Sequence, residues 1–301
     1  MSDLAAKLAR LRQQAGAPQA SPPPVGGRSR AIPPSDTPAR AAVDLTALRR
    51  MAGVRDRLSV VRPAPLRALT RDVPGDEIAP GLRLLEYATA WPEPPDEFDL
   101  TFARLTRARR EHLLHFDTET TGLAGGTGTR AFMIGAADWF AGQLRVRQLY
   151  ITSMAAETAM LREFARWIHA DTVLVSYNGK SYDAPLLATR YRLARLANPL
   201  VGLTHVDLLH PMRRRYRHVW ENCRMQTAER KLLRIVREDD LPGSEAPRAW
   251  LTYLRGGPST DLVRVAEHNL QDVRSLSGLL VEAHGWAARD AQAGSLAGDE
   301  K

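Results

Sequence analysis

The chain has 301 residues, and 44% of them are hydrophobic, which is enough to bury the core of a folded domain. Its 42 Lys and Arg residues exceed its 34 Asp and Glu residues by a formal charge of +8. That charge favours a polyanionic partner such as nucleic acid. However, most of the basic residues are arginine, and codon bias also produces such an excess of arginine. The single cysteine excludes an intrachain disulfide framework and a cysteine-rich zinc site. This low cysteine content fits a protein that resides in a reducing compartment.

Residues 1–41 predict a short basic helix followed by a disordered Pro/Ala-rich linker. Leu and Ala alternate with Lys and Arg at helical spacing over residues 4–12, and Pro, Ala, Gly and Ser cluster over residues 16–40. No segment approaches the roughly 18 consecutive apolar residues of a membrane span. The first helix also lacks the apolar core of a signal peptide, so we expect a cytoplasmic protein with no membrane association.

Residues 42–110 predict an accessory segment that packs on the main domain. Val43 to Met51 has the pattern of a short helix, and Leu82 to Ala88 has that of a strand. The proline-rich stretch from Trp91 to Pro95 ends the strand in a loop.

Residues 111–286 predict the main domain, and residues 287–301 a disordered tail. Apolar runs and alternating patterns indicate three strands joined as an antiparallel meander, followed by helices that alternate with further strands. This order predicts an α/β fold in which a mixed sheet, the meander plus parallel strands, is flanked by helices. The predicted elements are strands at 113–116, 131–140 and 143–151, a helix at about 155–169, a strand at 172–176, a helix after Asp183, a strand near 205–208, and helices beyond.

Two carboxylates stand at the end of the first strand of this domain. Asp117 and Glu119 are two residues apart, so their side chains point to the same face of an extended chain. Like charges held together at the edge of a core repel each other unless a cation lies between them. A hard divalent cation meets that need.

A third acidic residue follows the strand at 172–176. Asp183 comes five residues after Asn178 and immediately before an expected helix. Gly179 permits a tight turn that would bring Asp183 back to the strand edge. For Asp183 considered alone, capping of the helix is the simpler interpretation, whereas the first motif favours a metal ligand.

The fourth acidic residue belongs to the last long helix of the domain, which runs to about His284. Asp272 lies on the flank of that helix's apolar stripe, and His268 is one turn earlier on the same side. A carboxylate that faces a core needs a partner, so Asp272 predicts either a metal site or a structural pair with His268.

These motifs, Asp117 and Glu119, then Asp183, then Asp272, resemble the three motifs of the DEDD superfamily of 3′–5′ exonucleases, which have an RNase H-like fold. More narrowly, the chain resembles the YprB-type ribonuclease-H-like proteins over about residues 70–284. That narrower resemblance also rests on Gly125-Gly126-Thr127-Gly128, Asn222-Cys223-Arg224, the run from Arg237 to Gly243, and His268-Asn269.

The resemblance implies a metal-dependent nuclease, a 3′–5′ exonuclease on DNA or RNA that uses two Mg²⁺ or Mn²⁺ ions. It implies that Asp117, Glu119, Asp183 and Asp272 hold the ions and that His268 removes the proton from the attacking water. His268 lies four residues before Asp272, the offset typical of tyrosine in this superfamily, whereas its catalytic histidines lie five before. The residues expected to contact the substrate, a single strand or a 3′ end, are Thr120, Leu123, Asn178 and Lys180.

Alternatives remain open at this point. A non-catalytic nucleic-acid-binding module on the same fold, or an RNase H-like endonuclease, fits the same fold class. Leu123 is equally interpreted as a core residue and Lys180 as an exposed lysine. The basic run from Arg213 to Arg217 fits a phosphate contact or a solvated helix face. His205 and Asp207 form a weaker candidate for a metal pair.

Overall fold

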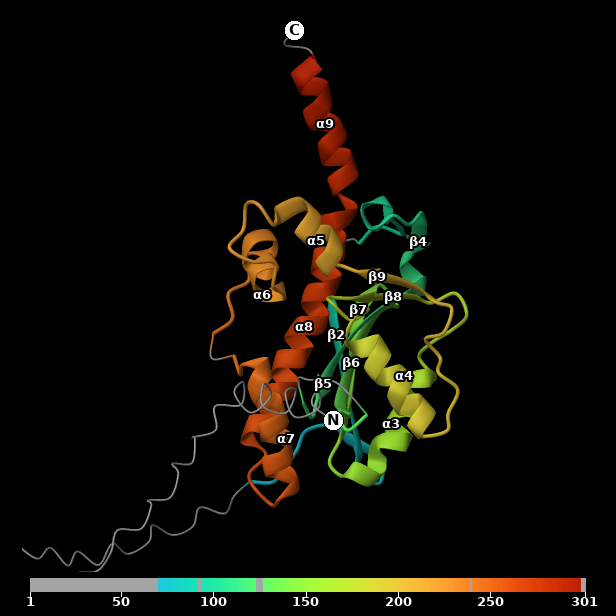
Figure 1. Cartoon of the computed structure of the whole chain (residues 1–301), viewed down its shortest axis with the longest axis vertical. Coiled ribbons are helices and arrows are strands. Elements are labelled where there is room, and N and C mark those ends of the chain that lie inside the picture. The colour runs from blue at the N-terminus through green and yellow to red at the C-terminus, as the bar shows by residue number, and fades with distance from the viewer. Residues whose placement is uncertain (1–69, 91–93, 123–126, 239, 299–301) are drawn as a thin grey trace, which may run out of the picture. The chain divides into compact units, whose positions relative to one another are not determined.

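The structure, a computed structural model, describes residues 70–90, 94–122, 127–238 and 240–298. The predictions for residues 1–69, and the one for Leu123, lie outside these ranges. Figure 1 labels helices and strands of the described residues.

A seven-stranded mixed sheet forms the centre of the described chain. Its strand order is β1-β2-β7-β6-β5-β8-β9. The pairs from β1 to β5 are antiparallel, whereas β5-β8 and β8-β9 are parallel. The strands are β1 (Asp76–Ala79), β2 (Leu82–Ala90), β5 (Leu113–Thr120), β6 (Ala131–Phe140), β7 (Gln143–Ile151), β8 (Val173–Ser176) and β9 (Thr204–Asp207), and a separate small sheet pairs β3 (Glu97–Asp99) with β4 (Arg107–Arg109).

The predicted mixed sheet is confirmed. β6 and β7 have the predicted bounds, and Ala141 and Gly142 join them with positive φ angles of 49° and 75°, as a tight hairpin requires. β5 is the strand where the antiparallel meander meets the parallel strands, and it extends four residues beyond the predicted apolar run. Both motif carboxylates therefore lie within the sheet.

Helices cover the two faces of the sheet, with α7 and α8 on one side and α3 and α4 on the other in Figure 1. The α-helices are α3 (Glu157–Ala165), α4 (Asp183–Leu193), α5 (Leu209–Tyr216), α6 (Met225–Ala228), α7 (Ala246–Leu254), α8 (Thr260–His284) and α9 (Trp286–Gly298). A π-helical turn, Glu229–Leu233, follows α6, and short 3-10 turns lie at Thr101–Ala103, Arg110–His112, Met154–Ala156 and Gly243–Glu245. α8 runs along β5, β6 and β7, so it can carry side chains to the end of β5.

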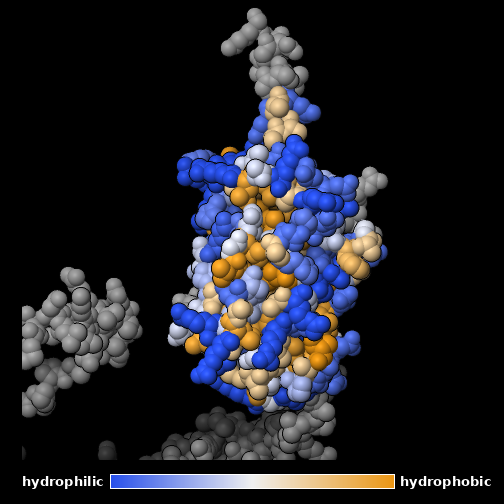
Figure 2. Space-filling model, turned by 90° about the vertical axis from the view of Figure 1, so that its right-hand side faces the viewer, coloured by the Kyte–Doolittle hydropathy of each residue, from blue (hydrophilic) through white to orange (hydrophobic). Residues whose placement is uncertain are grey.

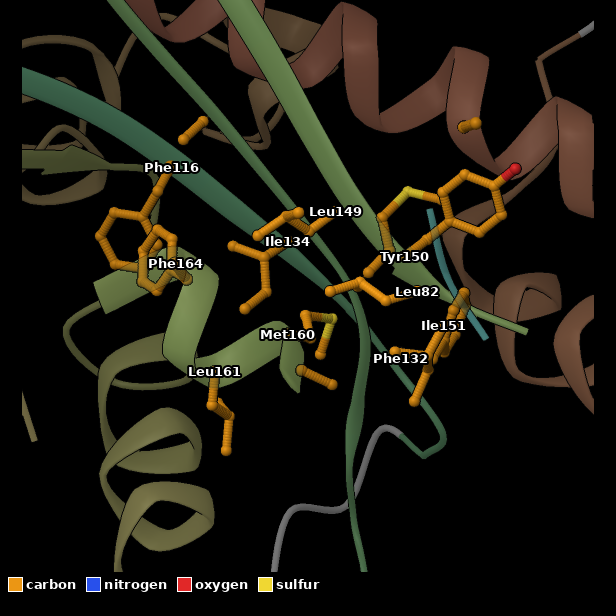
Figure 3. Packing of buried hydrophobic residues seen from close by; sticks show 14 of the residues in the cluster. Leu82, Phe116, Phe132, Ile134, Leu149, Tyr150, Ile151, Met160, Leu161 and Phe164 are labelled. Atoms are coloured by element: carbon orange, nitrogen blue, oxygen red, sulfur yellow. The ribbon is translucent and has the colours of Figure 1, made fainter. Parts of the chain in front are cut away.

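Aromatic and aliphatic side chains pack tightly between sheet and helices. Figure 3 shows Phe116 of β5 beside Phe164 of α3, with ring centroids 6.2 Å apart. Phe132 stacks on Trp250 of α7 at 5.2 Å, and the Trp250 indole N–H donates to the carbonyl of Ile151 at 2.7 Å. These contacts fix α3 and α7 on the sheet and leave β5 little freedom to move.

Two regions differ from the sequence expectation. β1 and β2 lie in the main sheet itself, because β2 pairs with β7 along its whole length, so this part of the predicted accessory segment extends the sheet rather than packing on it. The expected disordered tail contains helix α9. That helix begins at the buried Trp286 and is rich in alanine, and Asp290 accepts two hydrogen bonds from Arg215 of α5, at 2.6 and 2.8 Å.

The surface shown in Figure 2 is largely hydrophilic, with apolar patches between charged groups. Within the described ranges, no helix has both the length and the apolar character needed to cross a bilayer. α8 is long enough, but charged residues interrupt its apolar stripe throughout.

Candidate active site

A cleft with a volume of about 380 Å³ opens where β5, the start of α4 and the middle of α8 meet. All four predicted carboxylates line it, together with His268. The chain thus brings together side chains from three segments that are far apart in the sequence, namely Asp117, Glu119, Asp183, His268 and Asp272.

β5 supplies two of the carboxylates by simple strand alternation. Asp117 and Glu119 point to the same face, and the pairing with β6 shifts register between Glu119 and Thr120. Glu119 is buried, and its carboxylate accepts no hydrogen bond from the described residues. Burial without a donor makes this carboxylate the one most in need of a cation.

Asp183 is the first residue of α4 and is buried at the cleft. The hydroxyl of Thr118 on β5 donates a hydrogen bond to its carboxylate. A methyl group on Gly179 would overlap the Ser176 hydroxyl and would lie 3.1 Å from an Asp183 oxygen. Only glycine therefore lets the loop turn closely enough to bring Asp183 to β5.

The buried carboxylate of Asp207 on β9 accepts hydrogen bonds from the backbone of the same loop. Asp207 accepts the backbone N–H groups of Asn178 at 2.7 Å, Lys180 at 3.1 Å and Leu209 at 3.1 Å. Three donors satisfy this charge, so Asp207 is a structural residue of the loop. His205, its proposed metal partner, instead bonds the Ser176 hydroxyl at 2.7 Å, and Asp207 and His205 line a different cavity.

α8 places His268 and Asp272 one turn apart, with the His268 Nε2 atom 3.4 Å from an Asp272 oxygen. The other ring nitrogen, Nδ1, lies 2.7 Å from the carboxylate of Asp240. Asp240 belongs to the run from Arg237 to Gly243 on which the resemblance partly rests, but no role in the site was predicted for it. It orients the imidazole towards the cleft, as a carboxylate commonly does for a functional histidine.

Arg237 also reaches this corner of the site. Its buried guanidinium bonds Asp272, Asp240 at 3.2 Å, and the fully buried Glu229 at 2.8 Å. Asp272 is therefore already in contact with a guanidinium and an imidazole, whereas Glu119 and Asp117 have no cationic hydrogen-bond partner among the described residues. Of the four acids, only Asp272 thus has cationic hydrogen-bond partners among the described residues.

A buried amide network fixes Asp117. The amide of Asn269 donates to Asp117 at 3.0 Å, and its oxygen accepts from the amide of Gln148 at 2.9 Å. Gln148 also donates to the carbonyl of Ala266 at 2.8 Å, which sets the orientation of both amides. Asn269 can approach because Gly135, opposite Asp117 on β6, has no side chain: a methyl group there would overlap the Asn269 amide.

The ionisation of the cluster reflects its burial and crowding. Burial, followed by the charges of Asp272, Asp183 and Glu119, raises the pKa of Asp117 well above its ordinary value. Burial raises the pKa of Glu119 to about 8 and that of Asp183 to about 6. Burial lowers the pKa of His268, but the bond to Asp272 and the neighbouring carboxylates outweigh it and raise that pKa to about 9. The carboxylates thus repel one another and hold a proton on the imidazole.

The chemistry of these donors fits divalent cations. Carboxylate oxygens are hard ligands, and four converge here, of which only Asp272 has a cationic hydrogen-bond partner within the described ranges. Ligand atoms of Glu119, His268 and Asp272 lie within 4.8 Å of one another, so a cation held by the two carboxylates would lie beside the imidazole. A cation would relieve the repulsion that raises the pKa of Asp117 and Glu119.

The other residues predicted to contact the substrate line two different cavities. Thr120 and Asn178 line the cleft, and Thr120 donates to the carbonyl of Gly122 at 2.9 Å. The side chain of Lys180 lines a different cavity, on the other side of its loop. Tyr182, which sequence reasoning missed, lines the cleft and is 59% exposed. Its position directly before Asp183 was the only signal in the sequence.

Residues 114–284 match the sequence profile of the RNase_H_2 family, which is described as the RNase_H superfamily. The match covers more than half of the chain, so the protein belongs to the RNase H superfamily. The observed mixed sheet and flanking helices agree with that assignment.

Among known proteins, one from Bacillus subtilis (strain 168), named "Uncharacterized protein YprB", is 36% identical over 173 residues. That match covers 57% of this chain and 42% of the relative, so the chain spans less than half the length of the relative it matches. The predicted resemblance to YprB-type RNase H-like proteins is confirmed. A family B DNA polymerase from the archaeon Pyrobaculum calidifontis aligns with a TM-score of 0.45 at 17% identity, covering 56% of this chain and 24% of the polymerase.

The amide network predicts the effect of a single methyl group. Gly135→Ala should lower the free energy of unfolding by about 1–3 kcal/mol, because Asn269 must withdraw from Asp117. Chemical denaturation of the purified protein measures this difference. Gly128→Ala is a matched control, since a methyl group there has open space among the described residues and the φ of Gly128 is not positive. A Gly135→Ala protein as stable as the wild type would contradict the close approach.

The raised pKa values predict how stability depends on pH. A carboxyl with a raised folded pKa holds a proton that the unfolded chain has released, so stability falls as pH rises from the unfolded to the folded pKa. The stabilisation from a histidine with a raised folded pKa is likewise lost as pH rises through that value. Glu119 and His268, with pKa values of about 8 and 9, act in the same direction. Without divalent ions, the Tm should fall from about pH 6 to about pH 9.

Mg²⁺ or Mn²⁺ should reverse much of that fall, because an ion that binds only the folded state stabilises it. The increase in Tm on adding the ion should be largest at the alkaline end, where protons compete least for the carboxylates. Thermal unfolding scans at matched ionic strength measure both effects. A Tm that rises with pH without ions, or one that does not respond to either ion, would contradict the site.

Proposed function

We propose that the protein is a metal-dependent nuclease, and specifically a 3′–5′ exonuclease that hydrolyses phosphodiester bonds of DNA or RNA. The observation that carries the proposal is the convergence of Asp117, Glu119, Asp183 and Asp272 in one cleft. Membership of the RNase H superfamily supports a nuclease of this general kind. The fold alone does not specify exonuclease action, so that part rests on the site.

The cleft has room and chemistry for a nucleotide. Its acidic floor would hold two Mg²⁺ or Mn²⁺ ions, through the four carboxylates, and these ions supply activation of water and neutralisation of phosphate charge when bound. Besides the acids, Tyr177, Tyr182 and Leu186 line the cleft with aromatic and aliphatic surface. A base stacks favourably on an exposed aromatic ring, so the terminal base would lie against Tyr182.

His268 is the proposed proton acceptor, since it is the one imidazole among the described residues that line the cleft. Asp240 orients its ring through Nδ1, which leaves Nε2 directed towards Asp272 and the cleft. In the ion-free protein the imidazole carries a proton at neutral pH, because its pKa is about 9. Cations held by Glu119 and Asp272 would offset the charges that keep this proton in place.

Binding without cleavage is the second candidate function, and one observation favours it. Arg237 and His268 both pair with Asp272, so one of the four acids already has cationic partners. A protein that uses the cleft only to hold a strand would keep this arrangement unchanged.

A single strand labelled at its 5′ end should be shortened progressively from the 3′ end by the protein with Mg²⁺ or Mn²⁺. Asp117→Asn should lower the rate by at least about 100-fold, because it removes a metal ligand without changing side-chain size. The same variant should be more stable than the wild type without ions, since it removes a buried repelling charge.

The Asp117→Asn protein should thus be more stable but less active than the wild type. A variant that is inactive because it misfolds would instead be less stable. Asp76→Asn, a change of the same kind on β1 and at an exposed position, is the control and should leave both stability and activity unchanged.

Internal cuts, tested on a circular single strand, would assign an endonuclease instead. Binding with no cleavage by the wild type in either ion would assign the second function.

His268 can be tested separately from the ions. If it accepts the proton, His268→Gln should lower the turnover number by about 10²–10⁴-fold while the affinity for Mn²⁺ changes little. Asp240→Asn should produce a smaller loss of about 10–100-fold, because it disturbs only the orientation of the ring. Single-turnover rates and Mn²⁺ titrations of each variant measure these effects. Wild-type turnover in the His268→Gln protein would remove His268 from the proposed mechanism.

A further inference from the structure

A second cavity, of about 300 Å³, lies on the other side of the loop that carries Asp183. The loop divides the two spaces: Asn178 and Tyr182 line the acidic cleft, whereas Lys180 between them lines the second cavity. Three further segments contribute to its wall, with Arg104 from the turn before β4, Asp207 from β9, and His210 and Arg214 from α5.

Positive charge dominates this cavity. Its lining includes three permanent cations, Arg104, Lys180 and Arg214, and one carboxylate, that of Asp207. Asp207 is buried and already accepts three backbone N–H groups, so little of its charge is available to the cations. We name this space, defined by Arg104, Lys180, His210 and Arg214, the basic cavity.

The charges of these cations are not neutralised by acids in the part of the chain that the structure describes. Within those ranges, the ammonium of Lys180 and the guanidinium of Arg104 form no ion pair. The guanidinium of Arg214 donates to the carbonyl of Phe102, which is uncharged. By contrast, the neighbouring Arg215 is fully engaged by Asp290. Cations that converge from three separate segments repel one another, and a bound anion would relieve that repulsion.

Phosphate is the anion that this arrangement suits, because guanidinium and ammonium groups are its usual ligands in proteins. The position of the basic cavity argues for a phosphate that belongs to a strand. Lys180 is two residues from Asn178, and successive Cα atoms are about 3.8 Å apart, so the Cα atoms of these two lining residues are at most about 8 Å apart. A strand with its end in the acidic cleft would cover that distance within a few nucleotides.

We propose that the basic cavity binds backbone phosphates of a nucleic-acid strand whose 3′-terminal nucleotide occupies the acidic cleft. This rests on the proposed function, and it assigns Lys180 to a nucleotide upstream of the end rather than to the terminal one. The strand would pass over the loop at residues 177–182, with acids and cations acting on successive parts of it. The acidic floor repels a polyanion, and the basic cavity supplies the attraction that holds the strand in register.

Binding measured against strand length tests the assignment. All proteins carry Asp117→Asn so that no strand is cleaved. Fluorescence anisotropy follows a labelled short strand of two nucleotides, whose one phosphate would lie at the acidic cleft, and a labelled single strand of about 12 nucleotides, over a series of salt concentrations. Lys180→Ala should weaken binding of the longer strand and reduce the slope of log K against log salt by about 0.7, the value for one lost phosphate contact. Adding Arg104→Ala should reduce it by about 0.7 again. Binding of the short strand should not change.

Arg255→Ala is the matched control, because Arg255 is an exposed cation at the end of α7 that lines neither space. The proposal is overturned if the cavity variants behave like this control, or if they weaken the short strand as much as the long one. It is also overturned if inorganic phosphate displaces the long strand at concentrations similar to those of the strand itself, which would assign a free-phosphate site. A wild-type protein that binds long strands through these cations but never cleaves them would refute only the proposed nuclease.

Discussion

The mutual repulsion of buried carboxylates is the constraint on which the arrangement of the site depends. Asp117, Glu119 and Asp183 have raised pKa values because burial and their neighbours both oppose ionisation. The chain offsets part of this cost with its own groups. Asn269 and Thr118 donate hydrogen bonds to two of the acids, and Arg237 and His268 contact the fourth, Asp272. Glu119 accepts no such hydrogen bond from the described residues, so a cation would let it ionise where burial otherwise keeps its proton bound.

The fold meets this constraint by making the surroundings of the acids rigid. β8 pairs with β5 only at Leu113 to His115, whereas β6 pairs with it as far as Thr120. The end of β5 that carries the acids is therefore held by β6 and by α8. α8 packs along the same strand and carries Asn269 and Asp272 on successive turns. One helix therefore supplies both an amide that stabilises an ionised acid and a further acid that opposes it. Gly135 and Gly179 allow the two close approaches on which this geometry depends.

Sequence reasoning found the acids because their spacing has a geometric meaning. The alternation of Asp117 and Glu119, and the four-residue interval between His268 and Asp272, require only the periods of a strand and a helix. Arg237 and Gln148 could not be found that way, since they reach the site from elements whose position follows from packing. Lys180 shows the limit most clearly: it lies three residues from Asp183, yet the turn at Gly179 directs its side chain into another cavity. The proximity of Lys180 to Asp183 in the sequence therefore did not predict which cavity Lys180 lines.

The two kinds of buried acid in this protein show how structure separates ligands from scaffold. Asp207 and Glu119 are both buried carboxylates near the ends of strands, and the sequence pattern alone treats them alike. Asp207 accepts three backbone N–H groups, which stabilise its charge within the chain and fix the loop. Glu119 accepts no hydrogen bond from the described residues, and its pKa rises to about 8. A carboxylate left without donors in a rigid cleft lowers the stability of the ion-free fold, and only a ligand from outside the chain can recover that loss.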